Sequence, residues 1–515
     1  MRKFEFDDIR QVFEDVESAY PVDRWRVDDL AVWPIIRNDL YLRMFAGYFP
    51  PADGATSRSE SGWKRRLKGA ARIARSMAGD RIPMRAGQRS IADVVLLSDG
   101  ISYLTDSFGL TEKFCDPIAG IYSQAGYSTL LLNPSPRSEL SATTSTFPVR
   151  KLLDAQRDRQ RALGVLLRRR PRLDLTGYDR CAADVRAATG VSLLGPAELQ
   201  IIVGTIGAYA AVLETLLAAR RAKVGFLCCY YCNEGYAFVL ACRRLGIPAV
   251  DIQHGVGDHI HLAYVGWHRV PTEGYAVIPS AFWCWTCNDV KQIDRWARPL
   301  RSRHRALLGT NLPLDRHLAL SGEPDAAQRE IEAGLFGASV PSPRRPIRAL
   351  VSLQPNYLTD APWRESLHRM MARLGDQVVW WMRLHPGMRG DLERASAMAP
   401  AGLQTEYVKC TALPLYTLLR HADVHLTHCS STALEAAAFG VDTLLLSRLG
   451  ADYFSGLIAE GRATLVEEPA GFAAALRAAA AARIDPAVMA AGAAARLAHA
   501  RTTLLSLLAD PAGTH

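Results

Sequence analysis

An alternation of short apolar runs with helical stretches constrains the fold of this chain more than any other feature. Each run ends in polar residues or glycine, and a stretch with helical spacing follows it. The predicted strands are residues 92–99, 128–133, 223–231 and 248–253 in the N-terminal half, and 348–354, 378–384, 422–428, 442–447 and 463–468 in the C-terminal half. Such alternation is typical of parallel βαβ units. It predicts an α/β fold built from doubly wound parallel sheets.

The length of the chain predicts more than one domain. Its 515 residues exceed what one hydrophobic core organises, because domains run to roughly 100–200 residues. The stretch LLGTNLPLDRHLAL, residues 307–320, separates the two sets of strands and contains a turn-forming Gly-Thr-Asn-Leu-Pro break. The predicted organisation is a helical and basic N-terminal segment 1–90, a Rossmann-like domain 91–308, a second Rossmann-like domain 309–495 and a C-terminal helix 496–515.

Basic residues are unevenly placed along the chain. Of the net charge of +9, residues 58–89 carry +8, because ten Lys and Arg side chains there are opposed by only two acidic ones. Within them, residues 63–79 space apolar and basic side chains as a helix does, and a second basic run covers 159–173. Such stretches suit an anionic membrane surface or a polyanion, and a solvated helix face is the alternative.

The N-terminus and the cysteines predict a compartment. The opening MRKFEFDDIRQ lacks the apolar core of a secretory signal, so we expect a cytoplasmic protein. Its ten cysteines are then expected to be free thiols. Two CxxC pairs, Cys229/Cys232 and Cys284/Cys287, lie in apolar, aromatic sequence typical of buried strands, and we expect no zinc there. The apolar stretch 201–219 contains Glu214, which favours a buried domain helix over a membrane span.

Ligands of doubly wound domains bind outside the carboxyl ends of the strands, so candidate residues are sought there. After residues 422–428, Ser430, Ser431 and Thr432 stand where a helix begins, and Glu435 lies on its first turn. Hydroxyls and free backbone N–H groups at a helix start suit a phosphate, and ordinary N-capping is the alternative that needs no ligand. Glu435 is placed to accept hydrogen bonds from a ribose-like pair of hydroxyls.

A second strand end follows residues 378–384. It gathers Arg383, His385 and Arg389, and Pro386 ends the strand. Cationic or hydrogen-bonding side chains here suit the phosphates of a nucleotide. A histidine without a ligand is the commoner alternative.

A third group of strand ends includes residues 223–255, which have the pattern of one βαβ unit. Glu234 follows its first strand and His254 its second. A right-handed crossover brings both ends to the same edge of a sheet, where Asp99 is also expected after strand 92–99. A carboxylate and an imidazole together suit general acid–base or nucleophilic catalysis. A helix-capping Glu and a hydrogen-bonded loop His are the alternatives.

The segment VDIQHGVGDHIH, residues 250–261, has the composition of a metal site. Asp251 falls inside the predicted strand, His254 at its end, and Asp258, His259 and His261 in the following loop. The segment has no helical HExxH-type spacing, so we expect no metal. His254 is the strongest catalytic candidate of the segment.

Four motifs in this order resemble bacterial glycosyltransferases of the GT-B fold that build surface polysaccharides. They are Gln253-His254-Gly255, Gly309-Thr310-Asn311, Arg383-Leu384-His385-Pro386, and Ser430-Ser431-Thr432 with Glu435. The groups that the chain resembles are capsule and O-antigen Kdo transferases, bacterial sialyl- and polysialyltransferases, and CDP-glycerol glycerophosphotransferases. The resemblance covers roughly residues 90–465.

The resemblance implies an N-terminal acceptor domain and a C-terminal nucleotide-sugar donor domain that face a central cleft. It implies donor binding by Gly309, Asn311, Arg383, His385, Ser430, Ser431, Thr432 and Glu435, an acceptor side formed by Gln253, Asp258, His259 and His261, and catalysis by His254, Glu234 and Asp99. Sialyltransferases carry an acidic pair before glycine, of which this chain has only Asp99. Glycerophosphotransferases place a histidine before glycine, as this chain places His254.

The implied activity is metal-independent transfer of a sugar from a nucleotide-activated donor to a hydroxyl of a cell-surface glycan or its lipid-linked precursor. The resemblance favours CMP-Kdo or another CMP-sugar, with a UDP-sugar as the alternative. No cofactor and no nucleic acid is expected, and segment 63–89 is expected to attach the protein to the inner face of the cytoplasmic membrane. The other hypotheses are a sugar-nucleotide epimerase or hydrolase, a CDP-glycerol-type glycerophosphotransferase, and a non-enzymatic polyanion-binding protein.

Overall fold

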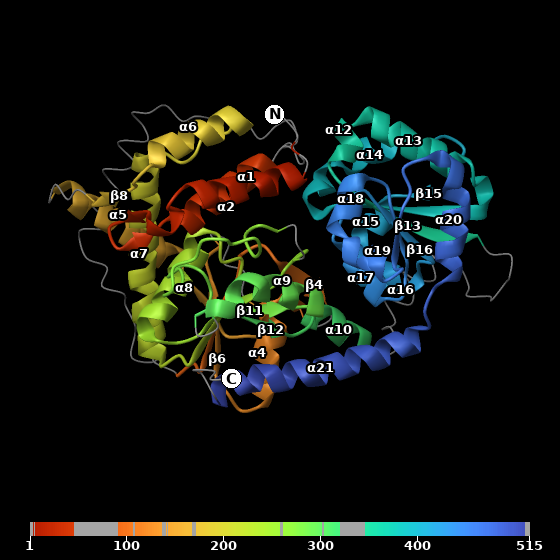
Figure 1. The fold of residues 1–515 in the computed structure, drawn as a ribbon. Coiled ribbons are helices and arrows are strands. Elements are labelled where there is room, and N and C mark those ends of the chain that lie inside the picture. The colour runs from red at the N-terminus through yellow and green to blue at the C-terminus, as the bar shows by residue number, and fades with distance from the viewer. Residues whose placement is uncertain are drawn as a thin grey trace. The chain divides into compact units, whose positions relative to one another are not determined.

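The computed structural model describes most of the chain in two compact units. The described residues are 4, 6–45, 91–106, 109–135, 141, 143–166, 171–257, 261–300, 303–319 and 346–509. Unit 1 contains the described residues up to Pro313 and those from Ala498 onward, and unit 2 contains those from Leu314 to Leu497. The basic segment 63–89 lies outside the described residues. Figure 1 labels the elements along the chain.

Unit 1 is built on a seven-stranded parallel sheet. In spatial order its strands are β12 (Arg305–Leu308), β11 (Ala281–Cys284), β10 (Ala249–Ile252), β9 (Val224–Cys228), β3 (Val94–Leu97), β6 (Thr129–Asn133) and β7 (Thr146–Pro148). Numbered along the chain, this order is 7-6-5-4-1-2-3, so the sheet is doubly wound with its switch point between β3 and β9. The inner strands are buried along their whole length, as parallel strands covered on both faces are.

Helices and small antiparallel elements complete unit 1. The helices are α1 (Phe6–Ala19), α2 (Trp33–Phe45), α4 (Cys115–Gln124), α5 (Arg150–Leu166), α6 (Tyr178–Thr189), α7 (Pro196–Arg220), α8 (Asn233–Leu245) and α9 (Cys287–Ala297). A hairpin joins β4 (Tyr103–Asp106) to β5 (Gly109–Glu112), and a small sheet joins β1 (Arg26–Val27) to β2 (Leu30–Ala31) and β8 (Leu173–Asp174). Trp25 and Trp33 are fully buried, so the described N-terminal helices are part of the unit 1 core.

Helix α7 contains the apolar stretch seen in the sequence. It is the one described helix long and apolar enough to cross a membrane, with a mean hydropathy of 1.9 in its most apolar window. Of that window, 56% is buried, and α7 packs against α5 and α8. These contacts are those of a core helix in an α/β domain.

Unit 2 repeats the same plan on six parallel strands. In spatial order they are β15 (Thr405–Glu406), β14 (Val378–Leu384), β13 (Ile347–Leu353), β16 (Val424–Thr427), β17 (Thr443–Leu445) and β18 (Ala463–Leu465). Along the chain this is the order 3-2-1-4-5-6, with the switch point between β13 and β16. Alternate residues enter two separate cores: Val351 packs in one, and its neighbour Leu350 packs in the other.

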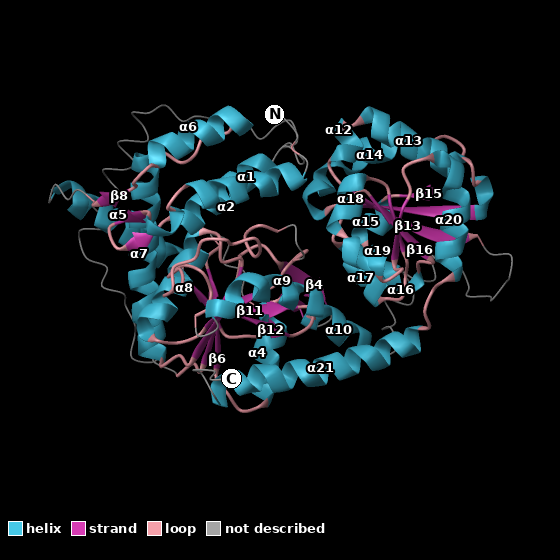
Figure 2. Ribbon diagram, in the orientation of Figure 1, coloured by secondary structure: helices cyan, strands magenta, loops and turns pink. Residues whose placement is uncertain are grey.

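The helices of unit 2 lie on both sides of this sheet (Figure 2). They are α12 (Asn356–Thr359), α13 (Ala361–Ala372), α14 (Leu392–Ala397), α15 (Val408–Ala412), α16 (Leu415–His421), α17 (Thr432–Ala438), α18 (Arg448–Tyr453), α19 (Ser455–Ala459) and α20 (Pro469–Ala481). The predicted fold class, two doubly wound parallel-sheet domains in one chain, is therefore confirmed by the two sheets.

Two helices contain the borders between the units. Helix α10 (Leu312–Ala319) follows β12, and α21 (Pro486–Ala509) follows α20. The C-terminal helix was expected from residue 496, but it begins ten residues earlier. Proline is favoured in the first helical turn, and the Asp485 carboxylate accepts the N–H of Ala487 at 2.8 Å. In unit 1, Leu504 of α21 is buried, and its carbonyl accepts the Tyr122 hydroxyl at 2.5 Å.

Candidate functional site

Asp99 lies at the switch point of unit 1 and connects its two central strands. One carboxylate oxygen accepts the N–H groups of Ile101 at 2.9 Å and Ser102 at 2.8 Å. The other accepts the Ser102 hydroxyl at 2.6 Å and the thiol of Cys228, the last residue of β9, at 3.8 Å. Asp99 therefore organises the loop after β3 and also presents a carboxylate at the predicted edge.

A second carboxyl group near Asp99 belongs to Glu112, which the sequence analysis missed. Glu112 is fully buried, and its Oε2 accepts the N–H groups of Phe114, at 2.9 Å, and Cys115. Burial, together with the negative charge of Asp99, raises the pKa of Glu112 to about 8. The site thus holds two interacting carboxyl groups. Glu112 was missed because it ends a strand of the separate hairpin β4–β5 and not a strand of the parallel sheet.

His254 follows β10, and its hydrogen bonds fix its tautomer. Nδ1 lies 3.1 Å from the carbonyl oxygen of Ile252, which can only accept, so Nδ1 carries the proton of the neutral ring. Burial lowers the pKa of His254, which favours this neutral form. The bare Nε2 is left as a base and lies 3.2 Å from the Tyr231 hydroxyl.

Tyr231 links His254 to His261 of the following loop. The Tyr231 hydroxyl lies 3.2 Å from Nε2 of each histidine. Because one hydroxyl has one proton to donate, it donates to His254 while His261 donates to it. Burial lowers the pKa of His261 to about 3, so this ring too is neutral at physiological pH. The structure therefore brings two of the predicted histidines into one hydrogen-bonded chain.

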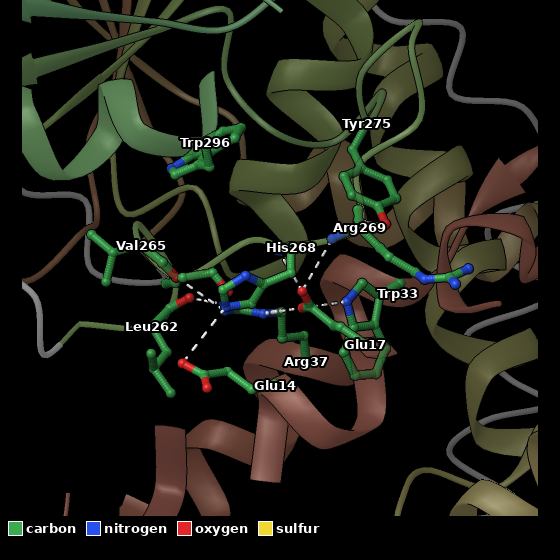
Figure 3. Close-up of polar contacts among 12 residues, drawn as sticks. Glu14, Glu17, Trp33, Arg37, Leu262, Val265, His268, Arg269, Tyr275 and Trp296 are labelled. Atoms are coloured by element: carbon green, nitrogen blue, oxygen red, sulfur yellow. Dashed lines mark hydrogen bonds and ion pairs between the residues drawn. The ribbon is translucent and has the colours of Figure 1, made fainter. Parts of the chain in front are cut away.

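A buried ion pair holds the loop that continues from His261. Glu17 of α1 and Arg37 of α2 lie 2.9 Å apart and are both fully buried. Arg37 donates to the carbonyl of Leu262 and, at 3.0 Å, to that of Val265. Glu17 accepts the N–H of His268 at 2.6 Å. Figure 3 shows these contacts, through which the N-terminal helices fix loop 262–269.

Glu234 lies in the first turn of α8 and is engaged by an arginine. Its Oε1 lies 2.6 Å from Nη1 of Arg150, the first residue of α5. Arg150 also contacts Asp154 at 3.2 Å. Glu234 is therefore at the predicted edge, but one of its oxygens is committed to an ion pair.

Three further predicted residues have structural contacts in unit 1. The Gln253 side chain is buried and joins two loops, donating to Gly255 O at 3.0 Å and accepting the Trp285 N–H at 2.7 Å. Gly309 and Asn311 follow β12 and belong to unit 1, although they were predicted in the second domain. A Cβ on Gly309 would lie 2.0 Å from the Trp283 indole, so packing explains this glycine.

The remaining two acceptor-side candidates, Asp258 and His259, lie outside the described residues. Gly255 has no positive φ, and none of the described residues lies within 4 Å of a Cβ added to it, so the described part of this turn does not require glycine. Among the described residues, no three His, Cys, Asp or Glu side chains are grouped to hold a metal ion.

In unit 2, the loop after β16 gathers hydroxyl groups at the switch point. Ser430 Oγ lies 3.0 Å from Thr432 Oγ1, and the N–H of Ser430 donates to Thr427 Oγ1 at 3.0 Å. Ser431 is exposed and its side chain makes no capping hydrogen bond. Helix α17 has only seven residues, so its dipole is weaker than the sequence suggested, and binding would depend on the hydroxyls and backbone of this loop.

Gln354, which the sequence analysis missed, lies across the same switch point at the end of β13. Its Oε1 accepts the N–H of Cys429 at 2.9 Å and fixes the start of the hydroxyl-rich loop. Beside it, the rings of Trp363 and His428 meet edge to face with centroids 5.4 Å apart. A polar residue after a buried strand was the available signal for Gln354.

His385 lies at the neighbouring strand end. Its N–H donates to Leu353 O at 3.0 Å, and its Nδ1 accepts the N–H of Gly387 at 3.1 Å. The neutral ring therefore carries its proton on Nε2, and the side chain is exposed. Burial of part of the ring lowers the pKa of His385. His385 is thus a neutral hydrogen-bond donor at the edge of the sheet.

Arg383 and Glu435 are more enclosed than their predicted roles suggested. Arg383 Nη1 donates to the carbonyls of Cys410 at 2.7 Å and Leu413 at 2.5 Å, which holds α15 against β14. Burial lowers the pKa of Arg383 to about 10. Glu435 is buried, and its Oε1 accepts the Tyr416 hydroxyl at 3.4 Å.

The solved structures to which this chain is similar include two epimerases and a glycosyltransferase. No protein-family model and no curated protein matches the sequence. The UDP-N-acetylglucosamine 2-epimerase of Rickettsia bellii is 13% identical over 81% of this chain and 97% of its own, with a TM-score of 0.45. The UDP-GlcNAc 2-epimerase of Neisseria meningitidis bound to UDP-GlcNAc is 10% identical over 81% and 99%, with a TM-score of 0.46. The glycotransferase of kitacinnamycin is 15% identical over 82% and 99%, with a TM-score of 0.42.

The fold is GT-B-like. This assignment rests on the two doubly wound sheets of the chain itself, because similarity at these identities and scores carries no argument about activity. Within the GT-B-like fold, each unit presents its own switch point. The described switch point of unit 1 carries titratable groups, and that of unit 2 carries hydroxyls and neutral hydrogen-bond donors.

Proposed function

We propose that this protein is a glycosyltransferase that moves a sugar from a nucleotide-activated donor to a hydroxyl of a glycan. The observation that carries the proposal is the pair of switch points in one chain, one lined by acid–base groups and the other by neutral donors. Ligands of doubly wound sheets bind at such points. Group transfer needs both kinds of surface. Neutral hydrogen-bond donors must hold the leaving nucleotide, and an acid–base group must take the proton of the acceptor.

Unit 2 is proposed to hold the nucleotide. Ser430, Ser431 and Thr432 offer hydroxyls, and His385 offers a neutral Nε2–H on the adjacent strand end. Such donors stabilise charge that grows on a phosphate oxygen as the bond to the sugar breaks. Glu435 is proposed to reach the ribose, and Arg383 to hold the loop in place. As the sugar donor we propose a CMP-sugar such as CMP-Kdo, with a UDP-sugar as the alternative, on the basis of the resemblance to surface-polysaccharide enzymes.

Unit 1 is proposed to activate the acceptor. His254 Nε2 takes the proton of the acceptor hydroxyl, the oxygen forms a bond to the anomeric carbon, and the bond from that carbon to the phosphate oxygen breaks with its electron pair. The unprotonated Nε2 of a neutral imidazole is suited to this step near neutral pH, once the acceptor hydroxyl replaces Tyr231 as its hydrogen-bond donor. Asp99 and Glu234 are the alternative bases, and Gln253 and His261 are proposed to support the acceptor side.

The proposed acceptor is a cell-surface glycan or its lipid-linked precursor. Segment 63–89 would attach the cytoplasmic protein to the inner face of the membrane, because clustered basic residues bind anionic lipid. This part of the proposal depends on the charge pattern of the sequence and on the resemblance to surface-polysaccharide enzymes.

Nucleotide binding is tested first. In a thermal-shift panel of CMP, CDP, UDP and GDP, only the nucleotides of one base should raise the melting temperature of the protein. Only a ligand that binds the native state stabilises it. His385→Ala and Ser430→Ala should weaken that affinity in calorimetry by about tenfold or more each, in line with a lost hydrogen bond to a charged group. His499→Ala, at an exposed position of α21, is the matched control. An unchanged nucleotide affinity in both site variants would contradict the proposal that unit 2 binds the nucleotide.

Turnover separates the reaction classes. With a nucleotide sugar and an acceptor glycan, mass spectrometry should show an acceptor that gains one sugar, and no product without acceptor. A product formed without acceptor would instead indicate an epimerase or hydrolase. Transfer of glycerol phosphate from CDP-glycerol would indicate a glycerophosphotransferase. Salt-sensitive polyanion binding without turnover, unaffected by loss of His254 and Glu234, would indicate a binding protein.

A further inference from the structure

The turn between β9 and α8 carries two cysteines at the switch point of unit 1. Cys229 and Cys232 flank this turn, and each thiol shifts the pKa of the other. Cys232 is exposed, and its Sγ lies 3.4 Å from the carbonyl oxygen of Cys229. Cys229 has a φ of +70°, in the left-handed region. The two residues between Cys229 and Cys232 therefore form part of a tight turn.

Helix α8 begins against this turn. A Cβ on Gly235 would lie 2.5 Å from the carbonyl oxygen of Cys229 and 2.6 Å from that of Tyr230, so only glycine allows the close approach. Cys232 is the N-cap of α8, and its Sγ accepts the N–H of Gly235 at 3.3 Å. A sulfur in this position is stabilised as a thiolate by the helix start.

The two thiols differ in reactivity. The neighbouring Cys229 thiol lowers the pKa of Cys232 against the opposing effect of burial, and the N–H of Gly235 lowers it further. The neighbouring Cys232 sulfur, with burial, raises the pKa of Cys229. Cys232 is thus the exposed nucleophile and Cys229 the less accessible partner beside it, the arrangement of an attacking and a resolving cysteine.

The chain contains a second CxxC pair between a strand and a helix, with different contacts. Cys284 is buried in β11, and its thiol donates to Phe282 O at 3.5 Å. The N-cap of α9 is Thr286, whose hydroxyl accepts the N–H of Asp289 at 3.1 Å. Cys287 is exposed but makes no such cap. This pair shares with the first its spacing and an exposed second cysteine, but it lacks a sulfur that caps the helix.

We propose that Cys229 and Cys232 are a redox-active dithiol, which low-molecular-weight disulfides such as oxidised glutathione convert to an intramolecular disulfide. The Cys232 thiolate attacks one sulfur of the small disulfide, and one small thiolate leaves. The Cys229 sulfur, after losing its proton, attacks Cys232 and releases the second small thiolate. Two protein thiols are oxidised, and one small disulfide is reduced to two thiols.

The disulfide would form beside two carboxylates at the edge of the sheet, Asp99 and Glu234. Cys228, next to Cys229, donates to Asp99, and Glu234 lies two residues beyond Cys232. In a reducing compartment such a disulfide is transient and responds to the thiol pool. The proposal depends on thiol chemistry alone and stands apart from the proposed transferase activity.

Differential alkylation of the folded, full-length protein tests the proposal. After equilibration in glutathione buffers from reducing to oxidising, peptide mass spectrometry should show a Cys229–Cys232 disulfide while Cys284 and Cys287 stay reduced. At pH 7 Cys232 should react with iodoacetamide at least tenfold faster than Cys287. A Cys232 rate equal to that of Cys287, or no Cys229–Cys232 disulfide in any buffer, would overturn the proposal.

Two variants locate the roles of the sulfurs. Cys229→Ser should stop at a glutathione adduct on Cys232, because the resolving thiol is gone. Cys232→Ser should give neither the adduct nor the disulfide. An adduct that forms instead on Cys229 in the second variant would reverse the assigned roles and refute the mechanism. The alkylation rates of the unmodified protein provide the same decision if either variant fails to fold.

Discussion

Glu17 and Arg37 form an ion pair whose side chains are both fully buried, with Arg37 Nε 2.9 Å from Glu17 Oε1 (Figure 3). The Arg37 guanidinium also lies 4.1 Å from the ring centre of Trp267. Every polar contact of the pair leads to the N-terminal helices or to loop 262–269. The pair therefore couples two segments that are more than 200 residues apart in the sequence.

Arg37→Met should destabilise unit 1 by about 3–5 kcal/mol, because it leaves the Glu17 carboxylate buried without its partner. Denaturant unfolding monitored by tryptophan fluorescence measures the loss. The double variant Glu17→Leu/Arg37→Met should be less destabilised than Arg37→Met alone. The exposed pair Arg448–Glu467, also 2.9 Å apart, is the control, and Arg448→Met there should cost no more than about 1 kcal/mol. Equal losses in both places would show that burial of the pair has no energetic role.

Unit 1 stability should fall as pH rises from about 6.5 to 8. Burial raises the pKa of Asp251 to about 8 in the folded protein, so the native state keeps a proton that the unfolded chain has lost. Asp251→Asn should reduce this slope by about 1.4 kcal/mol per pH unit. The buried histidines contribute little in the upper part of this window, because above about pH 7.5 their unfolded forms are mostly neutral as well. Exposed Asp179→Asn is the control, and an unchanged slope in Asp251→Asn would contradict the prediction.

Gly309→Ala should destabilise the protein by about 1–3 kcal/mol, because the new Cβ would overlap the Trp283 indole. Gly255→Ala, where none of the described residues lies within 4 Å of the new Cβ, should change stability little. Thermal unfolding of the two variants compares them directly. If Gly309→Ala does not lower the stability, Trp283 must move aside. Packing would then not explain Gly309, and its predicted role in donor binding would stand again.

The strands and their order along the chain were largely predictable from the sequence. Strand β14 was predicted at 378–384 and runs Val378–Leu384, because a long buried strand has an unbroken apolar pattern. The strand predicted at 223–231 ends at Cys228 instead, since the left-handed conformation of Cys229 stops it. Short edge strands such as β7 and β12 were missed, because their exposed or partly exposed residues interrupt the apolar pattern.

The site was predictable only where a strand end marks it. His254, Asp99 and the hydroxyls after β16 follow buried strands, so topology alone brings them to the edge of each sheet. Glu112 reaches the same edge through a separate hairpin. Gln354 directly follows the buried strand β13, so the rule that finds His254 also covers it. Arg383 shows the converse error: an arginine at a strand end suggested phosphate binding, but the backbone carbonyls near it were invisible in the sequence.

The tautomer of His254 gives the most direct test of its proposed role. Nitrogen-resolved NMR should show the neutral ring protonated on Nδ1, with a pKa below 6.5 because burial disfavours the charged form. Tyr231→Phe should raise that pKa, since it removes the hydroxyl that donates to Nε2. His261→Gln is the matched change on the other side of Tyr231.

If His254 is the base, turnover should decline as pH falls through the pKa measured by NMR, because protonation occupies Nε2. Tyr231→Phe should move the decline in turnover and the NMR pKa together, toward higher pH. A neutral ring protonated on Nε2 would contradict the structure, whatever the activity. If the tautomer is as described but turnover does not change through the His254 titration, the geometry is correct and His254 is not the base. Asp99 or Glu234 would then be the base.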